Sequence, residues 1–341
     1  MANAFRIERL DRGIKARSDD IFALASHREL LYLLGPRVLL IGGLLVFPLL
    51  RDVVGLYWLQ VVLITCSIAL LALSWDLLAS VGLVSLGQAM FFGVGGYIAG
   101  FLNKNLHWSP LFTIPTATIL GALVCAVILY PVLRLRGIYF ALITLTLPLL
   151  FMRVVEATKI LGGTDGMSGL DPLPDIIVVL YVAITVVFVA FFGFRRLTNE
   201  DYGLVLKGIR DSDRSVMAAG INIYWYKAQA VFIAGLPATF AGAFMTHQHQ
   251  FVGMPAFATD YSILPLTSAI IGGVGTFAGA LIGAFIIVPL SEFLRDFGTL
   301  RVVIYSVILV VFVVGVPEGI FHFLQRKYHQ FERRVSLEGE K

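Results

Sequence analysis

The stretch Lys207-Gly-Ile-Arg-Asp-Ser-Asp-Arg-Ser-Val-Met-Ala-Ala-Gly220 is the centre of the longest polar interruption in an otherwise mostly apolar chain. The interruption covers residues 195–222 and carries charges of both signs. Its spacing predicts a short amphipathic helix, because Ile209, Val216 and Met217 fall on one helical face. A helix this polar is not expected inside lipid, so the segment is either a solvated loop or a docking helix for a cytoplasmic partner.

The same segment contains pairing and termination signals. Asp211 and Arg214 are one helical turn apart, so we expect them to form an ion pair. Gly220 is expected to end the helix, because glycine readily adopts the left-handed conformation at helix C-termini, and Asn222 follows it. The prediction is a short helix over 207–221, with apolar runs on both sides.

Composition places the chain in the membrane. Of its 341 residues, 58% are hydrophobic and 14% are charged, whereas soluble domains carry about 25% charged residues. Continuous apolar runs of roughly 20 residues, long enough to cross a bilayer core of about 30 Å, recur along it. These runs favour an all-α, polytopic transmembrane helical bundle over a barrel of short alternating strands. The net charge of +4 is read as an orientation signal, not as a sign of nucleic-acid binding.

The apolar runs predict about ten crossings, provided that residues 262–296 turn back at Gly272–Gly275. The first run is broken by Arg51-Asp52 and Gly55 before the second begins. The predicted crossings are Val38–Leu50, Tyr57–Leu78, 82–102, Leu111–Leu133, Ile138–Val155, Ile176–Phe194, Tyr226–Gln250, the two limbs of 262–290, and Val302–Val316.

Two glycine-rich stretches, 82–102 and 270–283, stand out among these runs. Glycines spaced four apart allow close helix contact, and irregular backbone at membrane depth must be buried in protein or line a cavity. Their similar composition suggests two related halves with broken or re-entrant helices. The residues expected to line the path or pack these helices are Ser85, Gln88, Gly93, Gly96, Gly100, Gly272, Gly275, Gly279 and Gly283.

Ionisable and metal-binding side chains give weak signals. Asp76, the only charge in its run, is expected to be an interfacial acid at a helix end, with a role in the pathway as the alternative. His247 and His249 are two residues apart and would point to different faces, which disfavours a metal site. Cys66 and Cys125 lie in apolar runs and are expected to act as small hydrophobic residues, not as a disulfide.

Catalytic motifs are not found in the sequence. The loop Leu161-Gly-Gly-Thr-Asp-Gly-Met-Ser-Gly169 lacks the GK[ST] of a phosphate-binding loop and is expected to be a flexible turn. There is no Walker motif and no catalytic cluster, so we expect no enzymatic activity, no bound cofactor and no metal.

Lysine and arginine are in excess in the N-terminal tail, at Arg134 and Arg136, in 195–227 and in the C-terminal tail. The positive-inside rule places these segments, and both termini, in the cytoplasm. The expected organisation is a cytoplasmic tail over 1–36, a transmembrane domain over 37–321, and a second cytoplasmic tail over 322–341.

Five stretches in register resemble the M-type permease subunit of branched-chain amino-acid (LIV-type) ABC importers. They are spread over about residues 70–320, and only their joint order and spacing makes the resemblance specific. The stretches are Ser74-Trp-Asp-Leu-Leu-Ala-Ser80 with Gly82–Tyr97, Leu161–Gly169, Lys207–Asn222 with Tyr226-Lys227, Gly272–Gly279, and Val316-Pro-Glu-Gly-Ile320.

The resemblance implies a multi-pass permease of the cell inner membrane. It implies, as partners, a homologous H-type permease, two cytoplasmic ATPases that bind ATP-Mg, and a periplasmic or extracytoplasmic binding protein. Residues 207–221 would be the coupling helix, although Ser212–Ala219 depart from the Glu-Ala-Ala-like stretch common in the family. The residues implied in coupling are Lys207, Arg210, Asp211, Asp213, Arg214, Met217 and Gly220.

Branched-chain amino acids are the substrates that the resemblance implies, with urea or short amides as the alternative. A stand-alone secondary transporter or a channel is an alternative from a different class. A secondary transporter should carry ionisable residues deep inside its spans, whereas Arg153, Glu156, Glu292 and Arg295 all lie near the ends of apolar runs.

Overall fold

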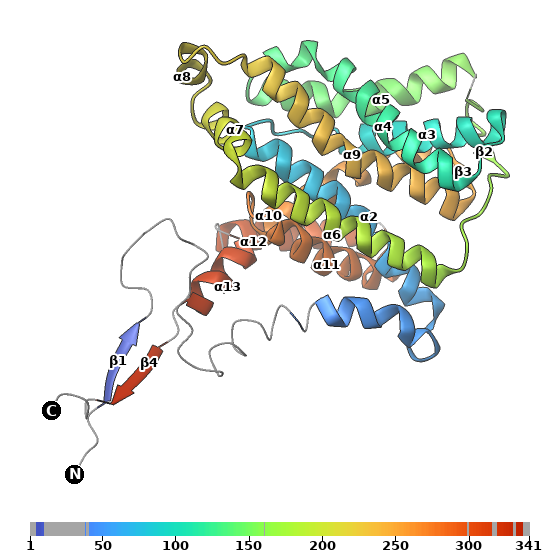
Figure 1. Ribbon diagram of the computed structural model, residues 1–341. Coiled ribbons are helices and arrows are strands. Elements are labelled where there is room, and N and C mark those ends of the chain that lie inside the picture. The colour runs from blue at the N-terminus through green and yellow to red at the C-terminus, as the bar shows by residue number, and fades with distance from the viewer. Residues whose placement is uncertain are drawn as a thin grey trace.

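The computed structural model describes residues 5–9, 38, 41–159, 161–298, 300–315, 319–329 and 332–336. Helices dominate these residues, and they run back and forth across one bundle (Figure 1). The α-helices are α2 (Arg51–Ser80), α3 (Gln88–Leu106), α4 (Pro110–Leu129), α5 (Ile138–Thr158), α6 (Ile176–Asn199), α7 (Asp201–Asp211), α8 (Asp213–Ala218), α9 (Ile223–His249), α10 (Asp260–Gly272), α11 (Ala278–Phe293), α12 (Leu300–Gly315) and α13 (Gly319–His329).

Short elements connect or flank these helices. The 3₁₀ helices are η1 (Phe47–Leu50), η2 (Pro131–Arg134), η3 (Met254–Phe257) and η4 (Arg295–Phe297). The strands are β1 (Phe5–Arg9), β2 (Met167–Ser168), β3 (Phe251–Val252) and β4 (Glu332–Ser336). The expectation of an all-α fold is therefore correct for the bundle, but two small two-stranded sheets are added to it.

Five helical stretches in the described part of the chain are long and apolar enough to cross a membrane: Ile41–Ser80, α4, α5, α6 and α9. The helix α11 is apolar but shorter. The chain is thus a multi-pass membrane protein, and the count of about ten crossings stays a prediction. Part of the first predicted span, Val38–Leu50, lies outside the described residues, and Gly55 breaks the helical backbone where the sequence predicted a break.

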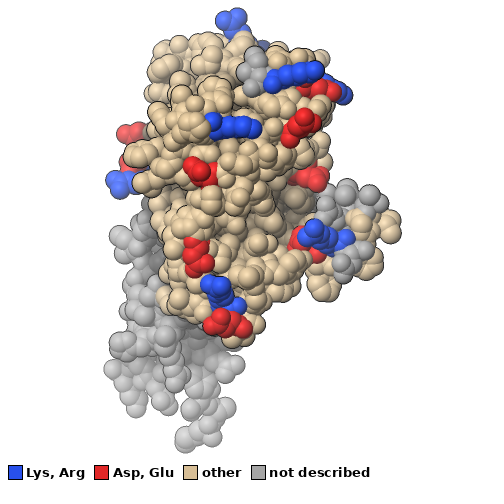
Figure 2. All heavy atoms as spheres, turned by 90° about the vertical axis from the view of Figure 1, so that its right-hand side faces the viewer, with Lys and Arg blue, Asp and Glu red and all other residues tan. Residues whose placement is uncertain are grey.

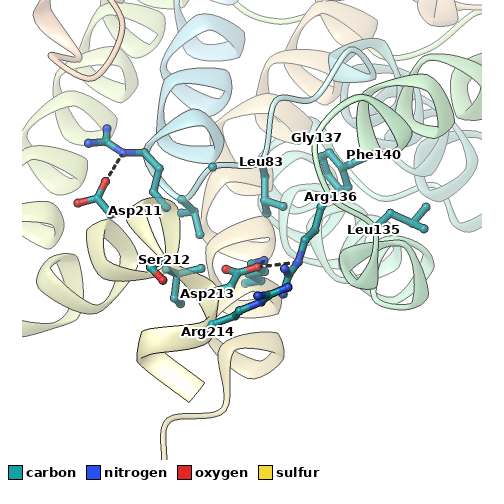
Figure 3. A pocket seen from close by; sticks show the side chains of 14 residues that line it. Leu83, Leu135, Arg136, Gly137, Phe140, Asp211, Ser212, Asp213 and Arg214 are labelled. Atoms are coloured by element: carbon teal, nitrogen blue, oxygen red, sulfur yellow. Dashed lines mark hydrogen bonds and ion pairs between the residues drawn. The ribbon is translucent and has the colours of Figure 1, made fainter. Parts of the chain in front are cut away.

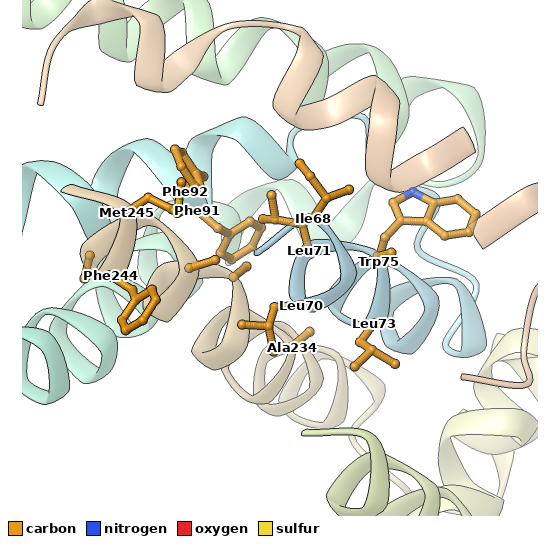
Figure 4. Packing of buried hydrophobic residues seen from close by; sticks show 14 of the residues in the cluster. Ile68, Leu70, Leu71, Leu73, Trp75, Phe91, Phe92, Ala234, Phe244 and Met245 are labelled. Carbon is orange, nitrogen blue, oxygen red and sulfur yellow. The ribbon is translucent and has the colours of Figure 1, made fainter. Parts of the chain in front are cut away.

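The helix α2 is the centre of the bundle. From Leu63 to Ser80 nearly every residue is buried, as expected for a helix that is apolar all round and surrounded by others. It packs against α6, α9, α10 and α11. Figure 4 shows Leu70, Leu71, Phe91 and Ala234 in the buried cluster that α2, α3 and α9 form together. The helix α2 therefore connects the part of the bundle around α9 to the α10–α11 pair.

Glycines allow α3 and α9 to approach one another closely. A Cβ atom on Gly95 would collide with the Thr239 carbonyl, and one on Gly242 would collide with the Phe92 carbonyl. A Cβ on Gly96 would lie 2.7 Å from Thr246 Oγ1. The two backbones therefore pack at a separation that no larger residue permits at these positions.

Segments far apart in the sequence meet at one end of the bundle. Met167 and Ser168 of β2 pair antiparallel with Val252 and Phe251 of β3, which ties the predicted flexible turn of 161–169 to the end of α9. Figure 2 looks onto the side of the molecule where β2 and β3 lie and shows acidic and basic side chains scattered over a largely uncharged surface.

A second pair of strands joins segments from the two ends of the sequence. The strand β1 pairs antiparallel with β4, from Phe5 opposite Ser336 to Arg9 opposite Glu332 (Figure 1). Most of the predicted tail over 1–36 lies outside the described residues. The predicted boundary at 321 falls inside α13 and stays a prediction.

Candidate functional site

The predicted single helix over 207–221 is two helices. The helix α7 ends at Asp211, Ser212 adopts an extended conformation (φ −160°, ψ 97°), and α8 begins at Asp213. Ser212 accepts a hydrogen bond at its Oγ from the backbone N–H of Ser215, at 3.4 Å. A serine followed by an acid is a strong start signal for a new helix, and this signal overrides the amphipathic periodicity.

Asp213 holds α8 against the bundle. Its Oδ2 atom lies 3.1 Å from Lys227 Nζ on α9 and 3.2 Å from Arg136 Nε between η2 and α5. The side chains of Lys227 and Asp213 are only 6% and 13% exposed. The predicted Asp211–Arg214 pair is absent from the described ion pairs, and Asp211 instead pairs with Arg210 at 3.3 Å (Figure 3). Asp213, assigned from sequence to partner contact, faces inward.

A cleft of about 360 Å³ lies where three turns of the chain meet beside α7 (Figure 3). It is lined by Val81–Leu83 before α3, by residues 135–137 and Phe140, by Ile209–Arg214, and by Lys227. Gly82 has φ +81°, and a Cβ atom there would lie 3.3 Å from Arg210 Cα. The turn between α2 and α3 therefore rests directly on α7.

The predicted apolar face of the 207–221 segment is divided between the two helices. Ile209 is buried in a small cluster with Val81, Leu206, Ile223 and Ala230. Val216 packs at the edge of that cluster, whereas Met217 is 40% exposed. Met217 is therefore an exposed apolar side chain of α8, the helix at the upper left of the bundle in Figure 1.

The remaining predicted coupling residues are on the outside. Gly220 adopts φ +80° after α8, and Asn222 then caps α9 by accepting at Oδ1 from the N–H groups of Tyr224 and Trp225 at 3.1 and 3.3 Å. The residues that the sequence predicted for coupling and that the structure exposes are Lys207, Arg210, Asp211, Arg214, Met217 and Gly220.

The polar residues of the first glycine-rich stretch form a buried network with α2. Ser74 donates to Gln88 Oε1 at 3.2 Å, and Trp75 Nε1 donates to the Ser85 carbonyl at 2.7 Å. The amide nitrogen of Gln88 has no partner among the described residues. Ser85 and Gln88 are thus at the protein interior, where the sequence placed them.

The glycines of α3 are packing positions. A Cβ on Gly93 would collide with the ring of Phe257, and one on Gly100 would come within 2.9 Å of both Val252 and Met167. These contacts join α3 to η3 and to the β2–β3 pair.

The second glycine-rich stretch folds back on itself at residues 273–277. Gly272 ends α10, Gly275 lies in the turn with φ +84°, and Gly279 and Gly283 lie in α11. Close backbone contact joins the limbs, since a Cβ on Gly272 would collide with the Gly279 carbonyl and one on Gly283 with the Ser268 carbonyl. The glycines therefore pack the two limbs of a hairpin and do not form one continuous helix face.

Asp76 is not the interfacial acid that the sequence predicted. It is fully buried, and its carboxylate accepts hydrogen bonds from the backbone N–H groups of Gly275 at 2.6 Å and Phe277 at 2.8 Å. The prediction failed because burial at this position comes from the α10–α11 turn, about 200 residues away in the chain. The sequence signal that could have indicated a buried acid was the position of Asp76 as the only charge in an apolar run.

His247 and the two cysteines are buried in the packed interior of the protein. His247 is buried, with Nε2 2.7 Å from Thr113 Oγ1 and Nδ1 2.9 Å from the Asp171 carbonyl. Cys66 and Cys125 are buried free thiols. The described residues contain no group of three or more potential metal ligands.

Comparison with known proteins agrees with the glycine-rich, multi-pass architecture. Residues 57–315 match the family described as the permease component of branched-chain amino acid transport systems. The chain belongs to this permease family. The match covers α2 through α12, apart from the first six residues of α2, and so includes both glycine-rich stretches and the α7–α8 segment.

Individual relatives are distant. The chain is 24% identical over 270 residues to the high-affinity branched-chain amino acid permease protein LivM of Escherichia coli (strain K12), a match that covers 70% of this chain and 64% of the relative. A probable LivM of Methanocaldococcus jannaschii is 24% identical, covering 57% of this chain and 63% of the relative. A probable LivH of the same organism is 25% identical, covering 59% and 68%. No solved structure matches the chain.

Proposed function

We propose that this permease forms half of the transmembrane path of an ATP-driven importer for branched-chain amino acids. Family membership supports the transport role, and the names of the LivM relatives support the substrate class. Likeness to both LivM and LivH supports pairing with a second, homologous permease of the H type. A binding protein outside the membrane and two cytoplasmic ATPases would complete the transporter, located in the cell inner membrane.

The observation that carries the coupling role is the placement of α8. It projects from the bundle with Met217 outward, while Asp213 fixes its base to Lys227 and Arg136. A firmly anchored helix with an exposed apolar side chain and exposed cations can bind a partner and transmit its movement. ATP binding by the partner would then shift a two-state bundle toward one of its openings.

The experiment is copurification of the membrane-expressed chain with its candidate ATPase, followed by uptake of labelled leucine in reconstituted vesicles. We expect Met217→Asp to abolish ATPase association, because it places a charge in the proposed apolar contact. The matched control is Leu204→Asp, an exposed apolar residue on α7 outside the proposed contact. Normal ATPase binding by a folded Met217→Asp protein would contradict the coupling role.

A further inference from the structure

The buried carboxylate of Asp76 holds the turn between α10 and α11. Both of its oxygens accept backbone hydrogen bonds, Oδ1 from Gly275 and Oδ2 from Phe277. Within the described part of the chain, no lysine or arginine pairs with this carboxylate. Hydrogen bonds to a charged group are stronger than neutral ones, and in a buried, low-dielectric position they fix geometry firmly.

The turn that Asp76 holds is strained. Phe277 has φ +50° and ψ −42°, and Ala278 donates its N–H to the Thr276 carbonyl across it, which makes a γ-turn with Phe277 at its centre. This conformation is rare and strained for a residue with a side chain, so it persists only where its surroundings impose it. The Phe277 side chain is buried against Phe194.

Three consecutive residues of α2 fasten both glycine-rich turns. Ser74 binds the start of α3 at Gln88, Trp75 binds the Ser85 carbonyl in the α2–α3 turn, and Asp76 binds the α10–α11 turn. One helical turn of α2 is thus the physical link between the two stretches that the sequence paired by composition. The segment Ser74–Asp76 is called the α2 node below.

Each turn held by the α2 node also contacts an element at the same end of the bundle. Gly82 of the α2–α3 turn lies against Arg210 of α7, and Gly319 at the start of α13 lies against Gly273 of the α10–α11 turn. The other end of α11 is bound to α2 as well, since Tyr57 donates to Glu292 at 2.8 Å. A displacement of α7 therefore has a continuous packed route to α2 and from there to α11.

We propose that Asp76 is a positioning residue that makes the two glycine-rich turns move as one unit with α7. This inference rests on the proposed function, because it assigns Asp76 a part in passing the ATPase-driven movement to the path. In the proposed cycle the carboxylate keeps the strained γ-turn in register with the α2–α3 turn. Without it the α10–α11 turn relaxes independently, and ATP hydrolysis no longer drives transport efficiently.

The test compares Asp76→Asn with Asp52→Asn, an exposed acid on the same helix, in the chain purified with its ATPases and binding protein. Asparagine keeps one acceptor oxygen but points an N–H₂ group at the second backbone donor. We expect hydrogen exchange of the Gly275 and Phe277 amides to rise about tenfold, and leucine uptake per ATP hydrolysed to fall about tenfold, with ATPase association retained. Asp52→Asn should change neither quantity.

Trp75→Phe is a second variant, for the case in which Asp76→Asn does not fold. It removes only the Nε1 hydrogen bond to Ser85, so exchange in the α10–α11 turn should stay slow while uptake per ATP still falls. Unchanged uptake per ATP in a folded Asp76→Asn or Trp75→Phe complex would overturn the proposal. Failure of the unmodified chain to bind an ATPase would instead refute the proposed function, and with it the transport role of Asp76. In that case the exchange rates of the Gly275 and Phe277 amides would still report whether Asp76 holds the turn.

Discussion

Gly242 shows how single atoms set the separation of α3 and α9. A methyl group there would occupy the position of the Phe92 carbonyl, which belongs to helix backbone and cannot rotate away. Core positions packed this closely resist even one added carbon, because neighbouring backbone must shift as a whole. The residue-scale consequence is that a change from glycine to alanine, usually favourable in a helix, is unfavourable here.

We therefore predict that Gly242→Ala lowers the stability of the purified protein by about 1–3 kcal/mol. The control is Gly193→Ala on α6, where a Cβ atom would meet nothing within 4 Å. That substitution should be neutral or slightly stabilising, by up to about 1 kcal/mol. Thermal unfolding in detergent measures both, and equal melting temperatures for the two variants would contradict the close α3–α9 packing.

At the scale of elements, the α7–α8 segment depends on one acid shared by two bases. Asp213 meets Lys227 and Arg136, which belong to different parts of the chain, so the contact closes α8 onto α9 and onto the turn before α5. Lys227 is almost fully buried, and a buried ammonium group without its partner is costly. Arg136 is half exposed and contributes less.

We predict that Asp213→Ala frees α8, because it leaves Lys227 buried without a partner. Hydrogen exchange over residues 212–219 should increase, and the protein should lose about 1–3 kcal/mol of stability. The double variant Asp213→Ala with Lys227→Met should recover most of that stability, since the uncompensated charge is gone. A double variant as unstable as Asp213→Ala alone would show that the Lys227 contact is not the cause.

At the scale of the whole molecule, α7 and α8 lie at one end of the bundle and the β2–β3 pair at the other (Figure 1). Basic residues are frequent in the connections at the α7 end, including Arg134, Arg136 and residues 195–227, and are scarce in 156–175 and 247–262. This asymmetry predicts that the α7 end faces the cytoplasm. The strands β1 and β4 pair antiparallel, so the residues 5–9 and 332–336 lie side by side.

We predict opposite labelling of two introduced cysteines, Asp165→Cys and Arg214→Cys, with a membrane-impermeant maleimide. Intact cells should label position 165, and inside-out vesicles should label position 214. The unmodified chain is the control and should not react, because Cys66 and Cys125 are buried. Labelling of position 214 in intact cells would reverse the orientation and remove the basis for ATPase coupling through α8.

The sequence by itself determined the class of protein, most of the long helices, the break at Gly55 and the reversal of the chain after Gly272. These depend on local properties, namely hydropathy over roughly 20 residues and the freedom of glycine to turn the chain. The left-handed conformation of Gly220 was predictable for the same reason.

Only the tertiary structure decided the depth of Asp76, the inward direction of Asp213 and the division of the 207–221 segment at Ser212. Asp76 is buried because the α10–α11 turn covers it. Its hydrogen-bond donors are the backbone N–H groups of Gly275 and Phe277, and a backbone donor cannot be recognised from the type of residue that carries it. Asp213 forms ion pairs with Lys227 and Arg136 because the tertiary structure brings both cations to its carboxylate. Contacts between residues distant in the chain depend on how helices are placed, which local patterns do not encode.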